Sequence, residues 1–250
     1  MKYMGSKARI AKHILPIMLK NRVEGQWWVE PVVGGANMID KVDGNRLGAD
    51  SNYWVIKALE CIRDFAMPKS SESFTESDYN AAAEYARGNG EAPFSDHFVG
   101  YALFAFSFGA KWIGGWCRGK NSNGDSRDYV AEQFRANQKQ KPLLQGIYLK
   151  CSSYLELLIP KNSVIYCDIP YFGTTKYKDS FDHDRFWSWC RAKVKAGHQV
   201  FVSEYNAPAD FVCVWQKEIQ SGLNTNSTKK GVEKLFVHES QVESDYHSLY

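Results

Sequence analysis

Three short apolar runs in this sequence end on an acidic residue, and this pattern constrains the fold more than any other feature. The runs are WWVE, ending at Glu30, RLGAD, ending at Asp50, and SVIYCD, ending at Asp168. A glycine-rich turn follows the first run, and an amphipathic helix pattern over 51–66 follows the second, with Ser51 or Asn52 as its cap. Strands that alternate with turns and helices in this way predict an α/β fold with a largely parallel sheet.

The carboxyl ends of parallel strands meet at one edge of a sheet, where open α/β folds bind their ligands. Glu30, Asp50 and Asp168 are therefore expected to converge there. Asp168 alone would equally suit a turn or a helix cap, because Asp-x-Pro is common in turns. The convergence of the acids favours a chemical site.

Later segments extend the predicted sheet. Strands are expected at 198–205, 211–218 and 234–240, the last two as an antiparallel pair at one edge. A helix is predicted over 181–197, with Asp182 as its N-cap and Gly197 at its C-terminal end.

The amino-terminal segment predicts a further helix. Ser6 is expected to cap it, Ile10, Ile14 and Ile17 to form its apolar face, and Pro16 to bend or end it.

Composition narrows the class of protein. The chain has 250 residues, of which 44% are hydrophobic, enough for one α/β domain with an insertion. Its apolar runs are strand-sized, and its start lacks the pattern of a signal peptide, so neither a membrane span nor a secretory leader is expected. The six cysteines form no CxxC pair, which favours a reducing cytoplasm and predicts no metal site. Cys167 and Cys213 lie in apolar runs and are expected to be buried.

Residues 70–148 differ in character from the rest of the chain. They are polar at first, then aromatic, and then glycine-rich and basic, and they are predicted to form a separate insertion. Lys111, Arg118, Lys120 and Arg127 lie in its basic segment, where they are candidates for contacts with DNA phosphates or guanines. A solvated basic loop is the plainer alternative for any one of them. Net charge is only +3, so any nucleic-acid surface must be local.

Several segments together resemble the Dam-type N6-adenine DNA methyltransferases, which use S-adenosylmethionine. The matching segments, in family order, are KYMGSK (2–7), VEPVVGGANM (29–38), GADSN (48–52), DIPY (168–171) and EYNAP (204–208). The resemblance implies a Rossmann-like, mixed seven-stranded catalytic domain over 1–69 and 149–250, with a target-recognition insertion over 70–148. It also implies a solitary modification enzyme, phage or prophage encoded, that acts on a short site such as GATC.

The resemblance implies a role for each matching residue. Tyr3, Lys7, Glu30, Pro31, Gly34, Gly35 and Asp50 would surround the cofactor, with Asp50 holding the ribose hydroxyls. Asp168 would accept a hydrogen bond from the adenine amine, the backbone of Ile169 and Pro170 would supply a carbonyl, and Tyr171 would stack on the extruded base. Ser153 and Tyr154 would lie near the cofactor's adenine, although plain core is as good an expectation for Tyr154.

This residue set suits the chemistry. An adenine amine in a duplex is paired and stacked, so the base must first be extruded. Acceptors on both N–H groups then direct the nitrogen lone pair and stabilise the charge that develops on it. Neither a metal nor a Ser-His-Asp constellation is needed, and double-stranded DNA is the only partner expected.

Two departures from the family pattern leave alternatives open. Ile169 replaces the first proline of D-P-P-Y, and Ala36 replaces the last glycine of the cofactor loop, which is tolerable unless that position needs a positive φ. A catalytically silent DNA-binding protein and an N4-cytosine methyltransferase are the alternatives. A nicotinamide oxidoreductase is disfavoured because G-x-G-x-x-G is absent after the first strand.

Overall fold

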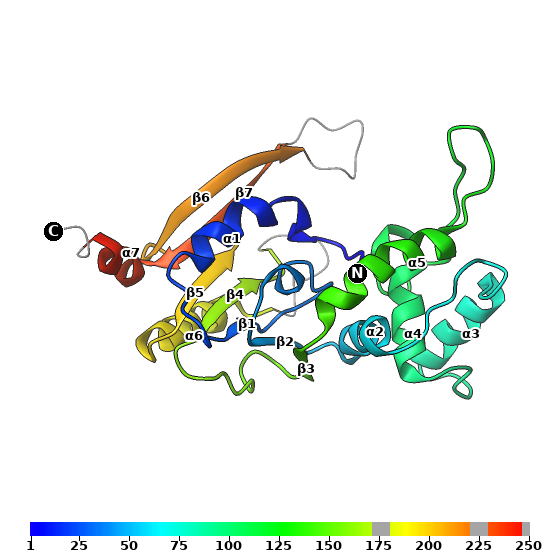
Figure 1. Cartoon of the computed structure of the whole chain (residues 1–250), viewed down its shortest axis with the longest axis horizontal. Coiled ribbons are helices and arrows are strands. Elements are labelled where there is room, and N and C mark those ends of the chain that lie inside the picture. Colours follow the sequence, from blue (N-terminus) through cyan, green and yellow to red (C-terminus); the bar gives the residue numbers. More distant parts are fainter. Residues whose placement is uncertain (172–180, 221–229, 247–250) are drawn as a thin grey trace.

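The structure is a computed structural model of the chain, and it describes residues 1–171, 181–220 and 230–246. Its centre is a seven-stranded sheet with the order β3-β2-β1-β4-β5-β7-β6 (Figure 1). The strands are β1 (Trp28–Glu30), β2 (Arg46–Asp50), β3 (Ile147–Cys151), β4 (Val164–Asp168), β5 (Gln199–Ser203), β6 (Phe211–Gln220) and β7 (Lys230–His238). The first five run parallel, and β7 is antiparallel to both β5 and β6. The predicted α/β class with a mixed, mostly parallel sheet is confirmed.

The helices surround the sheet and extend beyond one edge of it. They are α1 (Ala11–Leu19), α2 (Tyr53–Asp64), α3 (Glu76–Ala86), α4 (Asp96–Ala105), α5 (Tyr129–Gln140), α6 (His183–Lys195) and α7 (Glu239–Tyr246). In Figure 1, α1 lies on one face of the sheet, α6 lies on the other, and α2 to α5 gather beyond the β3 edge. None of the helices in the described ranges has the length and apolar character that crossing a membrane requires.

Alternation along the strands divides the core into two parts. On β1, Trp28 belongs to the cluster beneath α1, whereas Val29 belongs to the cluster that contains Phe186 and Cys190 of α6. Residues 164–167 of β4 are all buried, as a strand covered on both faces requires. In β1 and β4 the only charged side chains, Glu30 and Asp168, therefore occur where the strands end.

Local signals set most helix boundaries. The Asn52 side chain accepts a hydrogen bond from the Trp54 N–H at the start of α2, and Asp182 does the same for Arg185 at the start of α6. Gly197, at φ +87°, follows the end of α6. These predictions are confirmed.

Three expectations need correction. Ser6 caps only the short 3₁₀ turn Lys7–Arg9, and α1 begins at Ala11 and continues past Pro16 to Leu19. Cys213 is exposed, because it lies at a register shift in the edge strand β6, while Cys167 is buried as predicted. The sequence analysis did not predict β3, and the expected domain boundary at 148/149 falls inside that strand.

Candidate functional site

Three acids lie at the carboxyl ends of neighbouring strands. Glu30 ends β1, Asp50 ends β2 and Asp168 ends β4, and β1 pairs with both of the other strands. The chain adds strands outward from β1 to β3 and then returns to the other side of β1 as β4. The strand order therefore reverses between β1 and β4, which is where open α/β sheets bind ligands.

Lys7 reaches this site from the amino-terminal segment. Its Nζ lies 3.3 Å from Asp168 Oδ1 and 3.5 Å from Glu233 Oε2. The same ammonium lies 4.3 Å from the centre of the Tyr171 ring, a cation–π distance. Burial alone would lower the pKa of Lys7, but the attraction of Asp168 and Glu233 outweighs it and the pKa is raised. Lys7 therefore remains a cation at neutral pH.

Asp168 has a strongly perturbed pKa. Burial raises it to about 6, the Lys7 ammonium opposes that shift, and the nearby carboxylates of Glu233 and Glu204 add to it. The side chain still exposes 26% of its surface. The carboxyl group is thus accessible, largely ionised at pH 7.5 and protonated in mild acid.

Tyr171 is fixed on two sides. Its hydroxyl donates a hydrogen bond of 2.7 Å to Glu233 Oε2. Its ring meets the Tyr205 ring edge-on, with the ring centres 4.4 Å apart. Between Asp168 and Tyr171, Ile169 is 3% exposed and packs in the core on the α6 side, while Pro170 is half-buried. Ile169 thus contributes its side chain to the core and its backbone to the site edge.

Glu30 is the most buried of the three acids. It is 3% exposed, and its Oε1 accepts a 2.8 Å hydrogen bond from the Trp28 indole. Burial raises the pKa of Glu30 well above its usual value, and the charges of Asp40 and then Asp168 add to the shift. Pro31, also buried, directs the chain out of β1 into the glycine loop (residues 33–37).

Asp50 holds the start of the glycine loop. Its Oδ2 accepts a hydrogen bond of 3.2 Å from the Gly34 N–H, and its Oδ1 accepts one of 2.9 Å from the Asn52 N–H. Burial raises the pKa of Asp50, and these two hydrogen bonds oppose the shift. Gly34 adopts φ +48°. The loop and the tip of β2 therefore form one hydrogen-bonded unit.

Tyr3 covers this loop. A Cβ on Gly34 would lie 3.0 Å from the Tyr3 ring, and one on Gly35 would lie 2.6 Å from Tyr3 Cβ and 2.7 Å from the Met1 carbonyl oxygen. Ala36 has φ +56°, a left-handed conformation that L-residues disfavour. The position thus has the positive φ that makes alanine less favourable than the glycine of the family pattern, and the loop carries backbone strain.

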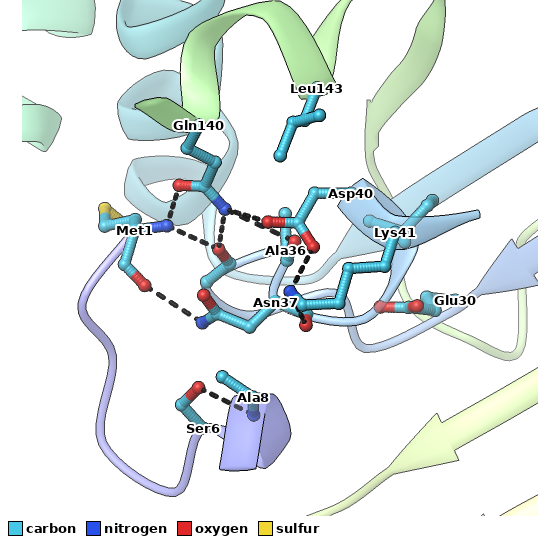
Figure 2. A network of polar contacts seen from close by, with 12 residues as sticks. Met1, Ser6, Ala8, Glu30, Ala36, Asn37, Asp40, Lys41, Gln140 and Leu143 are labelled. Atoms are coloured by element: carbon cyan, nitrogen blue, oxygen red, sulfur yellow. Dashed lines mark hydrogen bonds and ion pairs between the residues drawn. The ribbon is translucent and has the colours of Figure 1, made fainter. Parts of the chain in front are cut away.

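Gln140, the last residue of α5, fastens the far side of the glycine loop (Figure 2). Its Nε2 donates to the carbonyl oxygens of Gly35 and Ala36, at 3.1 and 3.3 Å, and to Asp40 Oδ2 at 2.8 Å. Its Oε1 accepts from the buried Met1 amine, whose pKa burial lowers to about 5. The sequence analysis did not single out Gln140, because a glutamine at the end of a helix carries no local signal of such a role.

Ser153 and Tyr154 lie in the segment after β3. The Ser153 hydroxyl donates to Glu156 Oε2 at 3.2 Å and accepts from the Glu156 N–H. Tyr154 packs among the rings of Phe181, Phe186 and Trp189, with ring centres 5.4 to 6.0 Å away. Tyr154 thus serves the packing of α6, and a cofactor role for this segment stays a prediction.

The four predicted DNA-contacting residues divide into two kinds. Arg118 pairs with Glu76, and Arg127 pairs with Glu132, each at 2.5 Å, and Arg127 also covers the Tyr129 ring. Lys120 is exposed and Lys111 is half-exposed, and neither forms an ion pair within the described part of the chain.

A surface hollow of about 510 Å³ lies beside the basic loop. Lys120 and Arg127 line it together with Arg135 of α5, an exposed cation that the sequence analysis did not single out. The two nearby tryptophans anchor the loop: Trp112 stacks on Trp54, with ring centres 5.4 Å apart, and Trp116 packs on Phe74. These ring contacts hold the start of the basic segment against α2 and against Phe74.

In comparisons with known proteins, no protein-family model and no curated protein sequence matches the chain. Within the described residues, no group of three or more His, Cys, Asp or Glu side chains is arranged to hold a metal ion.

Glu233 is a further site residue that the sequence analysis missed. Glu233 lies two and four residues before the buried Leu235 and Val237 on β7, so all three side chains share one face of the strand. The signal that could have found it is an acid on the strand face that otherwise carries Gly231, Leu235 and Val237.

Proposed function

We propose that this protein is a DNA methyltransferase that transfers the methyl group of S-adenosylmethionine to the N6 amine of adenine. The observation that carries the proposal is the meeting of Asp168 and Tyr171, from the DIPY segment, with Lys7, from KYMGSK. These segments are 160 residues apart in the sequence, and they meet at the switch point of the sheet beside Glu30.

The architecture agrees in kind with the proposal. The sheet is mixed, mostly parallel and seven-stranded. Helices α3 to α5 lie beyond the β3 edge, where residues 70–148 would present a surface to DNA (Figure 1). The exposed cations Lys120 and Arg135 are the strongest candidates for phosphate contacts, because Arg118 and Arg127 are already paired with glutamates.

The residues present fit S-adenosylmethionine. Each oxygen of Asp50 accepts one backbone N–H, which leaves lone pairs for the two hydroxyls of a ribose. Lys7 is a buried cation at the edge of the sheet from which the glycine loop emerges. Its charge suits the carboxylate of the cofactor's methionine portion. When bound, this cofactor supplies an electrophilic methyl group on a sulfonium centre.

The chain's own residues would prepare the amine. Asp168, ionised at neutral pH, accepts one N–H of the extruded adenine, and the carbonyl of Ile169 accepts the other. The Tyr171 face stacks on the base, a contact worth about 1–3 kcal/mol for comparable pairs. Lys7 lies against both Asp168 and Tyr171, so it has to move aside before the amine can bind.

A catalytically silent DNA-binding protein is the second candidate, and the same Lys7 geometry favours it. A lysine that never left Asp168 would exclude the amine. The N4 amine of cytosine is the alternative substrate, since its chemistry asks for similar acceptors.

Product analysis tests the proposal. The protein is incubated with S-adenosylmethionine and double-stranded DNA that lacks methylated adenine, and the DNA is digested to nucleosides for mass spectrometry. N6-methyladenine from the wild type, but not from Asp168→Ala, is the expected result. N4-methylcytosine would change the substrate base, and no methylated nucleoside from folded, cofactor-binding protein would refute the enzyme proposal.

A further inference from the structure

Glu233 is a buried acid supplied to the site by the antiparallel edge of the sheet. Strand β7 pairs with β5, with Ser203 opposite Leu235, so Glu233 extends two residues beyond the end of that pairing. Leu235 and Val237, on the same face, are buried apolar residues, as expected for an inward stripe. Glu233 is only 7% exposed, a costly environment for a carboxylate unless partners hold it.

One oxygen of Glu233 serves two groups of the site. Oε2 accepts the Tyr171 hydroxyl at 2.7 Å and lies 3.5 Å from Lys7 Nζ. Lys7 is thereby placed between Glu233 and Asp168, against the Tyr171 ring.

These contacts matter for the proposed reaction because Lys7 occupies the places that an extruded adenine needs. Lys7 is 7% exposed. If its buried ammonium moved away from Asp168 and found no other counter-charge, its desolvation would be costly. Glu233 offers that other partner within the site. Its hydrogen bond also fixes the orientation of the Tyr171 ring.

We propose that Glu233 is a positioning residue for methyl transfer, which holds the Tyr171 ring for stacking and receives Lys7 when the substrate amine takes its place on Asp168. This inference rests on the proposed function. Glu233 touches neither the amine nor the methyl group and acts through Tyr171 and Lys7.

A pH signature reports the electrostatic link between Glu233 and Asp168, and the rate of methyl transfer reports the positioning role. The charged groups that act on Asp168 are Lys7 from the amino-terminal segment, Glu204 after β5 and Glu233 itself. The titratable groups Glu30, Tyr166 and Tyr171 also face Asp168, and burial raises the pKa of each of them. Burial is the largest cause of the raised pKa of Asp168, and Glu233 raises it further. Glu233→Gln removes that repulsion, and it also leaves Asp168 as the one carboxylate of this pair that still faces Lys7. Each of these effects lowers the pKa of Asp168.

The test measures single-turnover methylation under saturating cofactor and DNA, from pH 5 to 8, for wild type, Glu233→Gln, Glu233→Asp and Tyr171→Phe. We expect Glu233→Gln to slow the reaction at pH 7.5 by about 10- to 100-fold. We also expect its acid limb to shift to lower pH by about one unit. Glu233→Asp restores the charge and should return the acid limb toward that of wild type. Glu24→Gln, an exposed glutamate on a loop, is the matched control and should change neither quantity.

Tyr171→Phe isolates the hydrogen bond, because it keeps the ring and removes only the hydroxyl. Its effect and that of Glu233→Gln should be non-additive in the double variant, since both break the same contact. Additive effects would remove the Tyr171 part of the inference. A Glu233→Gln rate within about twofold of wild type, with an unmoved acid limb, would overturn all of it.

A second readout keeps this test separate from the proposed function. Wild-type protein that makes no N6-methyladenine refutes the proposed function. ¹³C NMR titration of the Asp168 carboxyl in wild type and Glu233→Gln still decides the link between these residues. A downward shift of the Asp168 pKa supports the link, and an unchanged pKa overturns it whatever the activity.

Discussion

Asp168 is predicted to lower the stability of the folded protein at neutral pH. Its folded-state pKa is about 6, against an ordinary value of 3.8, with burial as the largest cause. An acid with a raised pKa binds its proton more tightly in the folded state than in the unfolded state. The protonated carboxyl therefore contributes its full share of stability below about pH 4. That share is lost as the pH rises through 6 and the carboxyl ionises in the folded state.

The magnitude follows from the shift. A difference of about 2 pH units corresponds to about 3 kcal/mol when the group is fully ionised. Because 26% of the Asp168 side chain is exposed, solvent screens part of this cost, and we expect about 1–3 kcal/mol. The folded-state pKa of about 6 already includes the attraction of Lys7, so the ion pair adds no separate amount to this free energy.

Asp168→Asn removes the charge and keeps one oxygen for Lys7. We expect the variant to be about 1–3 kcal/mol more stable than wild type at pH 7.5, a rise of about 2–12 °C in Tm for a chain of this size. The gain should fall to about a third of this value at pH 4.5, because that pH lies below the folded-state pKa of Asp168 but still above its ordinary value of 3.8. The same variant should lose methylation, so stability would rise as function falls.

Urea unfolding at pH 7.5 and pH 4.5 measures the difference in free energy of unfolding. Asp184→Asn, an exposed acid in the first turn of α6, is the control and should change stability by less than about 1 kcal/mol at either pH. The reasoning is refuted if Asp168→Asn is no more stable than wild type at pH 7.5, or if its gain is the same at both pH values.

Four further predictions follow from the site. Methylation should show an acid limb near pH 6, because Asp168 must be ionised to accept the amine, and a pH–rate profile with an unperturbed limb near 4 would contradict this. Gln140→Leu leaves buried acceptors of the glycine loop without their donor, so urea unfolding should show a loss of about 1–3 kcal/mol, together with weaker cofactor binding by calorimetry. Ala36→Val places a β-branched residue at φ +56° in a buried position, and thermal unfolding should show a loss of at least about 2 kcal/mol, whereas Ala36→Gly should stay within about 1 kcal/mol of wild type. Lys120→Ala should reduce the salt dependence of DNA binding by about one phosphate contact in a fluorescence titration, whereas Arg118→Ala, already paired with Glu76, should change it less.

Local signals in the sequence were sufficient for much of the fold. The apolar run before Asp168 predicted a covered parallel strand, and Asn52 and Asp182 predicted helix starts, because capping and strand burial depend on residues close in the chain. The edge strand β3 was missed because it has only one covered side and its sequence, IYLKC, lacks a continuous apolar run.

The candidate site was predictable only in part. Three acids at strand ends could be assigned to one edge of the sheet, since parallel strands must present their carboxyl ends together. That argument reaches no residue outside the strand ends. Glu233 enters the site because β7 runs antiparallel beside β5, and Gln140 because α5 ends against the glycine loop.

The sequence by itself thus determined most of the elements, their order and the acids at the strand ends, since these depend on neighbours within a few positions. Only the tertiary structure decided the partners of the charges. Lys7 lies between Asp168 and Glu233, and Arg118 is paired with Glu76. Electrostatic partners are fixed by distance in space, and a buried charge takes whatever counter-charge the packed chain brings within a few ångströms.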